Sequence, residues 1–90
     1  MVTVYVLLSI KDNATYVGMA LDAIIRLKEH NQSKNRYTKA HLPWKIIYTE
    51  EHPDWASARI REKYLKSTAG KRWLNKYFDD EGAITGSLPA

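Results

Sequence analysis

The stretch Thr3–Met19, TVYVLLSIKDNATYVGM, decides how the chain begins to fold. Residues 3–9 are almost all β-branched, aromatic or apolar, and such a run is typical of a buried strand. The polar cluster at residues 11–13 favours a turn, and strand character resumes over residues 15–19. We therefore expect a β-hairpin at the start of the domain.

Downstream of the hairpin, apolar periodicity predicts a helix over residues 21–30. Asn31 is expected to cap this helix, and a polar, basic loop is expected over residues 31–42, before Pro43. The side chains expected to face inward from this helix are Leu21, Ile24, Ile25 and Leu27.

The second half of the chain predicts one strand and two helices. Residues 44–49, WKIIYT, favour a strand, and Pro53 stands where a helix N-terminus tolerates proline. Helices are expected over residues 54–66 and 71–78, with Gly70 between them. Their inward-facing side chains are expected to be Ile60, Tyr64, Leu65, Trp73, Leu74, Tyr77 and Phe78.

The resulting order of elements, ββαβαα, indicates an α+β domain. Its small three-stranded, mostly antiparallel sheet is expected to be flanked by three helices. We expect the domain to span residues 1–78, and residues 79–90 to form a short, flexible C-terminal tail. Trp55 is expected to cover the start of the second helix, and the core is expected to include Val4, Val6, Trp44, Ile46, Leu65 and Trp73.

Composition excludes several classes of protein. Ninety residues suffice for one domain, and the absence of cysteine excludes disulfides, thiolate metal ligands and thiolate nucleophiles. No run of 18 apolar residues occurs, so no membrane-spanning segment is expected. The first residues, MVTVYVLL, are typical of a strand rather than a signal peptide, and we expect a cytoplasmic location.

The net charge of +4 is unevenly distributed along the chain. Residues 26–45 hold six Lys or Arg and one acid, and residues 59–76 hold seven and one. The remaining residues carry one Lys and eight acids, a balance of −7. Two basic segments in so small a domain can form one phosphate-binding surface, although a solvated lysine-rich helix surface is an open alternative.

The residues that carry chemistry form a spaced set. Phosphate-binding glycine loops, HExxH and paired catalytic carboxylates are absent. The set consists of Thr3-Val4-Tyr5, Tyr16-Val17-Gly18, Arg26, His30-Asn31 and Glu62-x3-Lys66. In this order and at these spacings, the chain resembles the GIY-YIG nuclease superfamily. It is most similar to the small stand-alone bacterial group related to the excision-repair endonuclease module, and the resemblance covers residues 2–77.

Glu62 is the metal ligand that the resemblance implies, with Mg²⁺ or Mn²⁺ as the cofactor. Mg²⁺ prefers oxygen ligands, keeps several waters and often takes only one or two protein carboxylates. A lone acid in a basic segment can hold such a metal where a phosphate arrives. The alternative for Glu62 is an i,i+4 ion pair with Lys66.

Arg26 and His30 lie one helical turn apart and are expected to project from one face. Arg26 can grip a phosphate and offset transition-state charge, or it can form a helix pair with Asp22. The resemblance places His30 in the active site, where it can donate to a phosphate oxygen or relay a proton. A histidine at this position can also cap the C-terminus of the helix.

Tyr5 and Tyr16 lie on the two hairpin strands and are expected to face one site. The resemblance makes one of them the general base for the attacking water, and we favour Tyr16, with Tyr5 orienting the water. Two positions depart from the family pattern: Thr3 replaces the first glycine, and Met19 replaces a lysine of some repair members. Gly18 fits a close backbone approach at a strand end.

These residues together predict a metal-dependent DNA endonuclease that hydrolyses phosphodiester bonds. Basic loops read phosphates rather than bases, so cleavage is expected to follow DNA structure, with a role in DNA repair or recombination. RNA as substrate and a protein partner for targeting stay open. The alternative function is a catalytically inactive nucleic-acid-binding domain. The residues expected to contact the DNA backbone are Lys34, Arg36, Thr38, Lys39 and Lys66.

Overall fold

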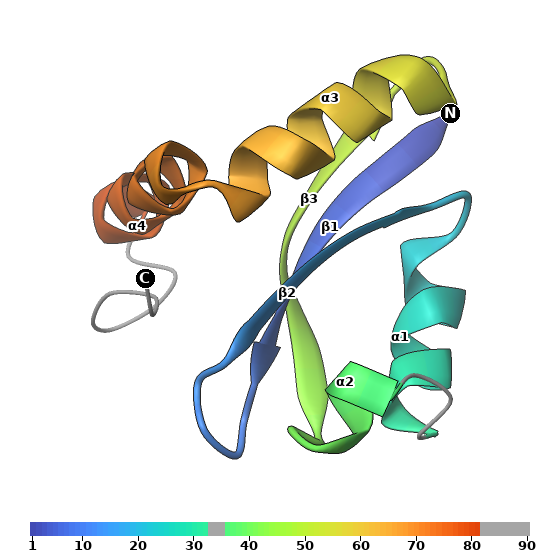
Figure 1. Ribbon diagram of the computed structural model, residues 1–90, viewed down its shortest axis with the longest axis vertical. Helices are drawn as coiled ribbons and strands as arrows, with labels where there is room; N and C mark the ends of the chain where they lie inside the picture. Colours follow the sequence, from blue (N-terminus) through green and yellow to red (C-terminus); the bar gives the residue numbers. More distant parts are fainter. Residues whose placement is uncertain (33–35, 82–90) are drawn as a thin grey trace.

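A computed structural model of the chain describes residues 1–32 and 36–81. Figure 1 shows a sheet with helices on both of its sides. The elements along the chain are β1 (Val2–Ser9), β2 (Thr15–Ala20), α1 (Ala23–Asn31), α2 (Arg36–Lys39), β3 (Trp44–His52), α3 (Trp55–Lys66) and α4 (Thr68–Glu81). The predicted α+β class and three-stranded sheet are confirmed.

The sheet has the strand order β2-β1-β3, and both strand pairs are antiparallel. The hairpin register places Tyr5 opposite Gly18 and Leu7 opposite Tyr16. Side chains alternate along a strand, so Tyr5, Tyr16 and Gly18 share one face of the sheet. The hairpin turn uses Asn13 in the left-handed region, with a φ of 61°, which asparagine tolerates better than most residues.

The two faces of the sheet bury different residues. Helices α3 and α4 cover the face that carries the even-numbered valines of β1 (Figure 1). The fully buried side chains there include Val4, Val6, Leu65, Leu74 and Phe78. Helix α1 covers the opposite face, where Tyr5, Leu7 and Trp44 are buried.

Helix α1 rests on the sheet through a different set of side chains from the predicted one. Ala23 and His30 are buried, whereas Leu21 precedes the helix and is 70% exposed. Ile24 and Ile25 are also exposed, so three of the four predicted inward positions are wrong. The prediction failed because the buried residues of α1 are a small alanine and a polar histidine. A pattern of large apolar side chains therefore points to the wrong face of the helix.

Helix α3 shows the same kind of error. Leu65 is buried as predicted, but Ile60 is 73% exposed and Tyr64 is also exposed. Ala58 occupies the inward position instead, because a small side chain lets the helix approach the sheet closely. Trp55, at the first position of α3, is half exposed.

Several predicted boundaries change. The basic segment after α1 contains the short helix α2, and β3 continues three residues beyond the predicted end, to His52. Helix α4 reaches Glu81, so the first residues of the predicted tail are helical. Residues 82–90 lie outside the described residues.

Asn31 does not cap α1, contrary to the prediction. It is the last residue of that helix, and its side chain bonds both backbone groups of Trp44. Trp44 N donates to the amide oxygen at 2.8 Å, and the amide nitrogen donates to Trp44 O at 3.2 Å. Asn31 therefore ties the end of α1 to the start of β3.

Candidate functional site

Three rings from three elements meet on the α1 side of the sheet. The ring centroids of Tyr16 and His30 are 4.8 Å apart, and that of Tyr5 lies 6.4 and 6.2 Å from them. Tyr5 is buried, and its hydroxyl hydrogen-bonds with His30 Nε2 at 3.1 Å. Tyr16 is half-buried. The structure therefore brings both predicted tyrosines and the predicted histidine together.

His30 is held from both sides within the protein. Its Nδ1 hydrogen-bonds with Thr38 Oγ1 at 2.9 Å, while Nε2 meets the Tyr5 hydroxyl. Burial, assisted by the charge of Arg26, lowers the pKa of His30 below its ordinary 6.5, so the ring is neutral at pH 7. A neutral imidazole has one donor and one acceptor, and both are used here. In this arrangement both ring nitrogens of His30 already have partners within the protein, Thr38 and Tyr5.

Thr38 is likewise not a surface residue. Its side chain is fully buried and bonds His30, which contradicts the predicted contact with the DNA backbone. Its carbonyl also accepts a hydrogen bond from the Trp44 indole at 2.8 Å. Helix α2 thus turns Thr38 inward, a packing result that a polar loop sequence does not reveal.

Gly18 lies where a side chain would collide with both tyrosines. A Cβ added at Gly18 would lie 2.5 Å from the Tyr5 hydroxyl oxygen and 3.0 Å from Tyr16 Cε1. Since Tyr5 is fully packed, it has little room to move. The close backbone approach predicted from the sequence explains why glycine is needed here.

The two phenols differ in their surroundings. Burial raises the pKa of Tyr5 above its ordinary 10, and the neighbouring Arg26 guanidinium offsets only part of this shift. Tyr5 therefore stays protonated at neutral pH. Tyr16 is more accessible and lines an open pocket of about 280 Å³.

Arg26 lies at the outer side of this cluster. Its Nη1 donates to Glu29 Oε1 at 2.9 Å, and the side chain remains 39% exposed. The alternative pairing with Asp22 is not formed. Asp22 is instead the N-cap of α1, where its carboxylate accepts from Ile24 N at 2.9 Å. Arg26 thus presents a partly exposed guanidinium next to the buried phenol.

Glu62 projects from α3, and its side chain is 13% exposed. Its Oε2 lies 3.4 Å from Lys66 Nζ, so the predicted i,i+4 ion pair is present. Within residues 1–32 and 36–81, no group of three or more potential metal-ligating side chains occurs. Mg²⁺ is often bound by one protein carboxylate and fills its other coordination positions with water, so Glu62 fits as the sole protein ligand of such an ion.

Lys66 links Glu62 to the tyrosines. It lines the 280 Å³ pocket together with Tyr16, Tyr37 and Lys71. The ring of Tyr37 stacks on that of Tyr16 with centroids 6.1 Å apart. Tyr37 and Lys71 were not among the predicted site residues: Lys71 is one of many cations in its segment, and Tyr37 lies in a segment predicted as loop.

Three of the other four residues predicted to contact nucleic acid are exposed, and the fourth lies outside the described residues. Arg36 and Lys39 are exposed on α2, and Lys66 is exposed at the end of α3. Lys34 lies outside the described residues. The exposed cations therefore flank the Tyr16 side of the cluster, since α2 also carries Tyr37.

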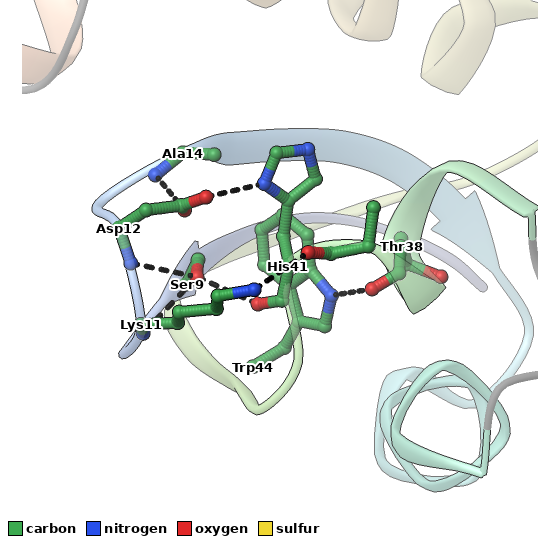
Figure 2. Close-up of polar contacts among 8 residues, drawn as sticks. Ser9, Lys11, Asp12, Ala14, Thr38, His41 and Trp44 are labelled. Atoms are coloured by element: carbon green, nitrogen blue, oxygen red, sulfur yellow. Dashed lines mark hydrogen bonds and ion pairs between the residues drawn. The ribbon is translucent and has the colours of Figure 1, made fainter.

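A second polar cluster ties the hairpin turn to the loop after α2 (Figure 2). His41 Nδ1 lies 2.6 Å from Asp12 Oδ2, and the hydrogen bond to His41 lowers the pKa of Asp12 to about 2. Ser9 is buried, and its hydroxyl donates to the carbonyl oxygen of His41 at 2.6 Å. Because Ser9 bonds the backbone and not the imidazole, the cluster is no hydrolase triad. It positions α2, and the His41 ring packs 4.9 Å from that of Tyr37.

Comparison with known proteins identifies similar sequences. A family model described as the GIY-YIG catalytic domain matches residues 1–78. The UPF0213 protein of Bacillus licheniformis is 35% identical over 78 residues, which cover 86% of this chain and 79% of that protein. A UPF0213 protein of Streptococcus sanguinis is 39% identical over 56 residues, 61% of this chain and 64% of the relative.

A solved structure shares the fold. The solution NMR structure of the UPF0213 protein BH0048 from Bacillus halodurans matches with a TM-score of 0.51 at 30% identity. The match covers 86% of this chain and 85% of that chain. In the part of the chain that the structure describes, no helix combines the length and apolar character that crossing a membrane requires.

Proposed function

This chain belongs to the GIY-YIG nuclease family, and from that premise we propose that it is a metal-dependent DNA endonuclease. The observation that carries the proposal is the convergence of Tyr5, Tyr16 and His30 beside Arg26, at the edge of a lysine-lined pocket. A ring cluster built only for packing has no need of a partly exposed guanidinium beside Tyr5, or of two lysines in the pocket that Tyr16 lines. Phosphodiester hydrolysis needs such positive charge where the phosphate binds.

Tyr16, in its phenolate form, is the group we propose to accept a proton from the attacking water, which leaves a neutral phenol and a hydroxide nucleophile. It is half-buried and lines the open pocket, so the residue is in contact with solvent. Tyr5 stays protonated, and with His30 Nε2–H donating to the phenol oxygen, the single Tyr5 hydroxyl proton is left to orient that water. His30 and Thr38 act as positioning residues, because their hydrogen bonds hold the Tyr5 hydroxyl in place.

Arg26 is the group we propose to stabilise the charge that develops on the phosphoryl oxygens. A guanidinium binds phosphate with two parallel hydrogen bonds, and its charge persists at any working pH. The ion pair with Glu29 restrains the side chain at the mouth of the site. This restraint reduces the ordering that substrate binding would otherwise require.

Glu62 is the residue that would hold the metal. A bound Mg²⁺ or Mn²⁺ would supply positive charge to the phosphate and lower the pKa of a coordinated water. Without a metal, Lys66 balances the Glu62 carboxylate at 3.4 Å. Release of that pair would free Lys66 for the DNA backbone, where it lies close to Lys71 across the same pocket.

The substrate class follows from the chemistry of these contacts. Lysines and arginines at the pocket and on α2 recognise phosphates, which carry no sequence information. We propose that DNA structure, such as a nick, flap or branch, guides cleavage, in DNA repair or recombination. A cytoplasmic location and a protein partner for targeting belong to the same proposal, and the substrate test below includes RNA.

A catalytically inactive nucleic-acid-binding domain is the second candidate. It is favoured by one observation: the Glu62 carboxylate is already paired with Lys66, and within the described residues it belongs to no group of three or more potential metal ligands. Binding alone needs the cationic pocket but not the tyrosine cluster.

The test uses nicked, branched, single-stranded and duplex DNA, and a matched RNA, with and without Mg²⁺ or Mn²⁺. We expect metal-dependent nicking that Glu62→Ala and Tyr16→Phe each abolish. Matched controls are Glu51→Ala, which removes an exposed carboxylate, and Tyr64→Phe, which alters an exposed phenol. Salt-sensitive binding without cleavage in any metal would support the second candidate, and full activity of Glu62→Ala would overturn its role.

A further inference from the structure

A second pocket lies at the other end of strand β2, next to Arg26. Its volume is about 390 Å³, within the range typical of small-ligand sites. Its lining is mainly apolar and includes Met19, Leu21, Ile25 and Trp55, with the Arg26 side chain at one wall. The function proposed above assigns no role to these apolar residues.

The apolar wall of this pocket is open to solvent. Leu21 is 70% exposed, Ile25 56% and Trp55 50%, although all three are large hydrophobic side chains. They come from three segments: the turn before α1, α1 itself and the first position of α3. Exposed apolar side chains that gather around one pocket indicate a binding surface rather than scattered surface residues.

Arg26 connects this pocket to the tyrosine cluster. The same side chain lines the pocket and lies beside the Tyr5 hydroxyl. A phosphate held by Arg26 would therefore have its own or a neighbouring nucleoside at the pocket. We propose that the pocket formed by Trp55, Leu21 and Ile25 binds an unstacked nucleobase adjacent to the scissile phosphate. This inference rests on the proposed nuclease function.

Charge complementarity favours a nucleotide strand over an apolar peptide. Both ends of β2 carry a pocket, one lined by Lys66 and Lys71 and the other by Arg26, Asp22 and apolar side chains. The Asp22 carboxylate is engaged by backbone amides at the start of α1, which leaves the Arg26 guanidinium as the charge that faces a phosphate. A nucleic-acid strand matches this arrangement, because it joins anionic phosphates to flat, largely apolar bases. Indole and aliphatic side chains stack on any base, so the pocket would not read sequence.

The expected consequence is a preference for unpaired bases. A base inside a duplex must first be unstacked, at a cost of a few kcal/mol, whereas a base at a nick, flap or branch is already partly free. The pocket would thus supply the structure guidance that the phosphate contacts cannot give. Duplex DNA would bind through its phosphates alone.

The experiment measures DNA binding without metal, so it does not depend on cleavage. A flap oligonucleotide carries the fluorescent base 2-aminopurine at the unpaired position next to the junction, and a fully paired duplex is the control. With the natural chain we expect fluorescence quenching by Trp55 and tighter binding of the flap. Trp55→Ala is expected to remove the quenching and to weaken flap binding on the order of tenfold, with duplex binding unchanged.

Two further variants keep the test decisive. Ile60→Ala removes an exposed apolar side chain of the same helix outside the pocket, and it should bind like the natural chain. Ile25→Ala alters the pocket without touching α3 and should weaken flap binding alone. Unchanged flap binding by Trp55→Ala, or equal loss on flap and duplex, would overturn the proposal. Preserved flap selectivity without cleavage in any metal would instead overturn only the proposed nuclease activity.

Discussion

The two faces of the three-stranded sheet differ in the side chains that they bury. On the α3 and α4 face, Val4, Val6 and Leu8 of β1 pack against apolar helix residues. On the α1 face, Tyr5, which alternates with Val4 and Val6 along β1, hydrogen-bonds with the buried His30. One strand therefore contributes alternately to the apolar core and to the tyrosine cluster, so the packing around Val4 and Val6 is separated by face from that around Tyr5. Helix α3 serves both, because it also carries Glu62 and Lys66 of the candidate site.

Polar side chains cluster on both faces of the sheet, and the cluster on the α1 face borders the lysine-lined pocket. At the margin of the α3 face, Glu50 bonds Tyr48, His52 and Arg61. Burial would raise the pKa of Glu50, and these three hydrogen bonds outweigh it and lower the pKa below its ordinary value. Burial and the bond to Glu50 raise the pKa of Tyr48 to about 12. In this network Tyr48, His52 and Arg61 all bond the Glu50 carboxylate, and the Arg61 bond joins β3 to α3. The cluster of Tyr5 and Tyr16, in contrast, opens onto the lysine-lined pocket.

The largest expected effect lies on the core face. Phe78→Ala removes a fully buried ring and should reduce the free energy of unfolding by about 3–5 kcal/mol, measured by urea denaturation. Cleavage per folded molecule should stay near that of the natural chain, because Phe78 does not contact the tyrosine cluster. A loss of activity larger than the loss of folded protein would contradict the view that Phe78 acts on stability alone.

A pair of glycines gives the next test, with one glycine on each side. A Cβ at Gly70 would lie 2.0 Å from the Tyr64 carbonyl oxygen, where backbone must move, while a Cβ at Gly18 meets tyrosine side chains. Each Ala substitution is expected to cost about 1–3 kcal/mol of stability, with Gly70→Ala the more severe. Thermal unfolding measures this loss, and a nicking assay on the folded fraction should show the larger defect in Gly18→Ala, which meets both tyrosines. Gly70→Ala acts only indirectly, through the backbone next to the pocket-lining Lys66 and Lys71. Equal nicking defects would contradict the comparison.

The smallest expected effect is a pH dependence that originates on the α1 face. The pKa of His30 is lowered on folding by burial and by Arg26, with Glu29 opposing. Above pH 6.5 the ring is neutral in both states and its contribution to stability is complete; as the pH falls below 6.5, the unfolded chain binds the proton first and stability declines.

His30→Gln should remove this decline while it keeps a side chain able to hydrogen-bond. Urea denaturation at several pH values between about 5 and 7 measures the slope, which for one histidine is at most that of one proton. Tyr5 and Thr38 touch the ring, and neither changes charge in this range, so the slope reports His30. A slope that persists unchanged in His30→Gln would contradict the assignment to His30.

Local sequence patterns predicted much of the fold because they act between near neighbours. The apolar runs of β1 and β2 and the turn at residues 11–13 predicted the hairpin, and the structure has it. The inward faces of α1 and α3 were mispredicted at Leu21 and Ile60, because a helix face is chosen by the surface it packs on. Ala23 and Ala58 allow close approach, which a hydrophobicity pattern does not register.

The sequence by itself determined the residue types and their order. It also determined the alternation along β1, by which the Tyr5 side chain points to the opposite face of the sheet from Val4 and Val6. It therefore predicted the family and named the candidate site residues. Only the tertiary structure decided what those residues touch: that Thr38 turns inward to His30, that Tyr37 stacks on Tyr16, and that Trp55 joins Arg26 at one pocket. Those contacts join segments far apart along the chain, and their geometry depends on how the helices pack on the sheet.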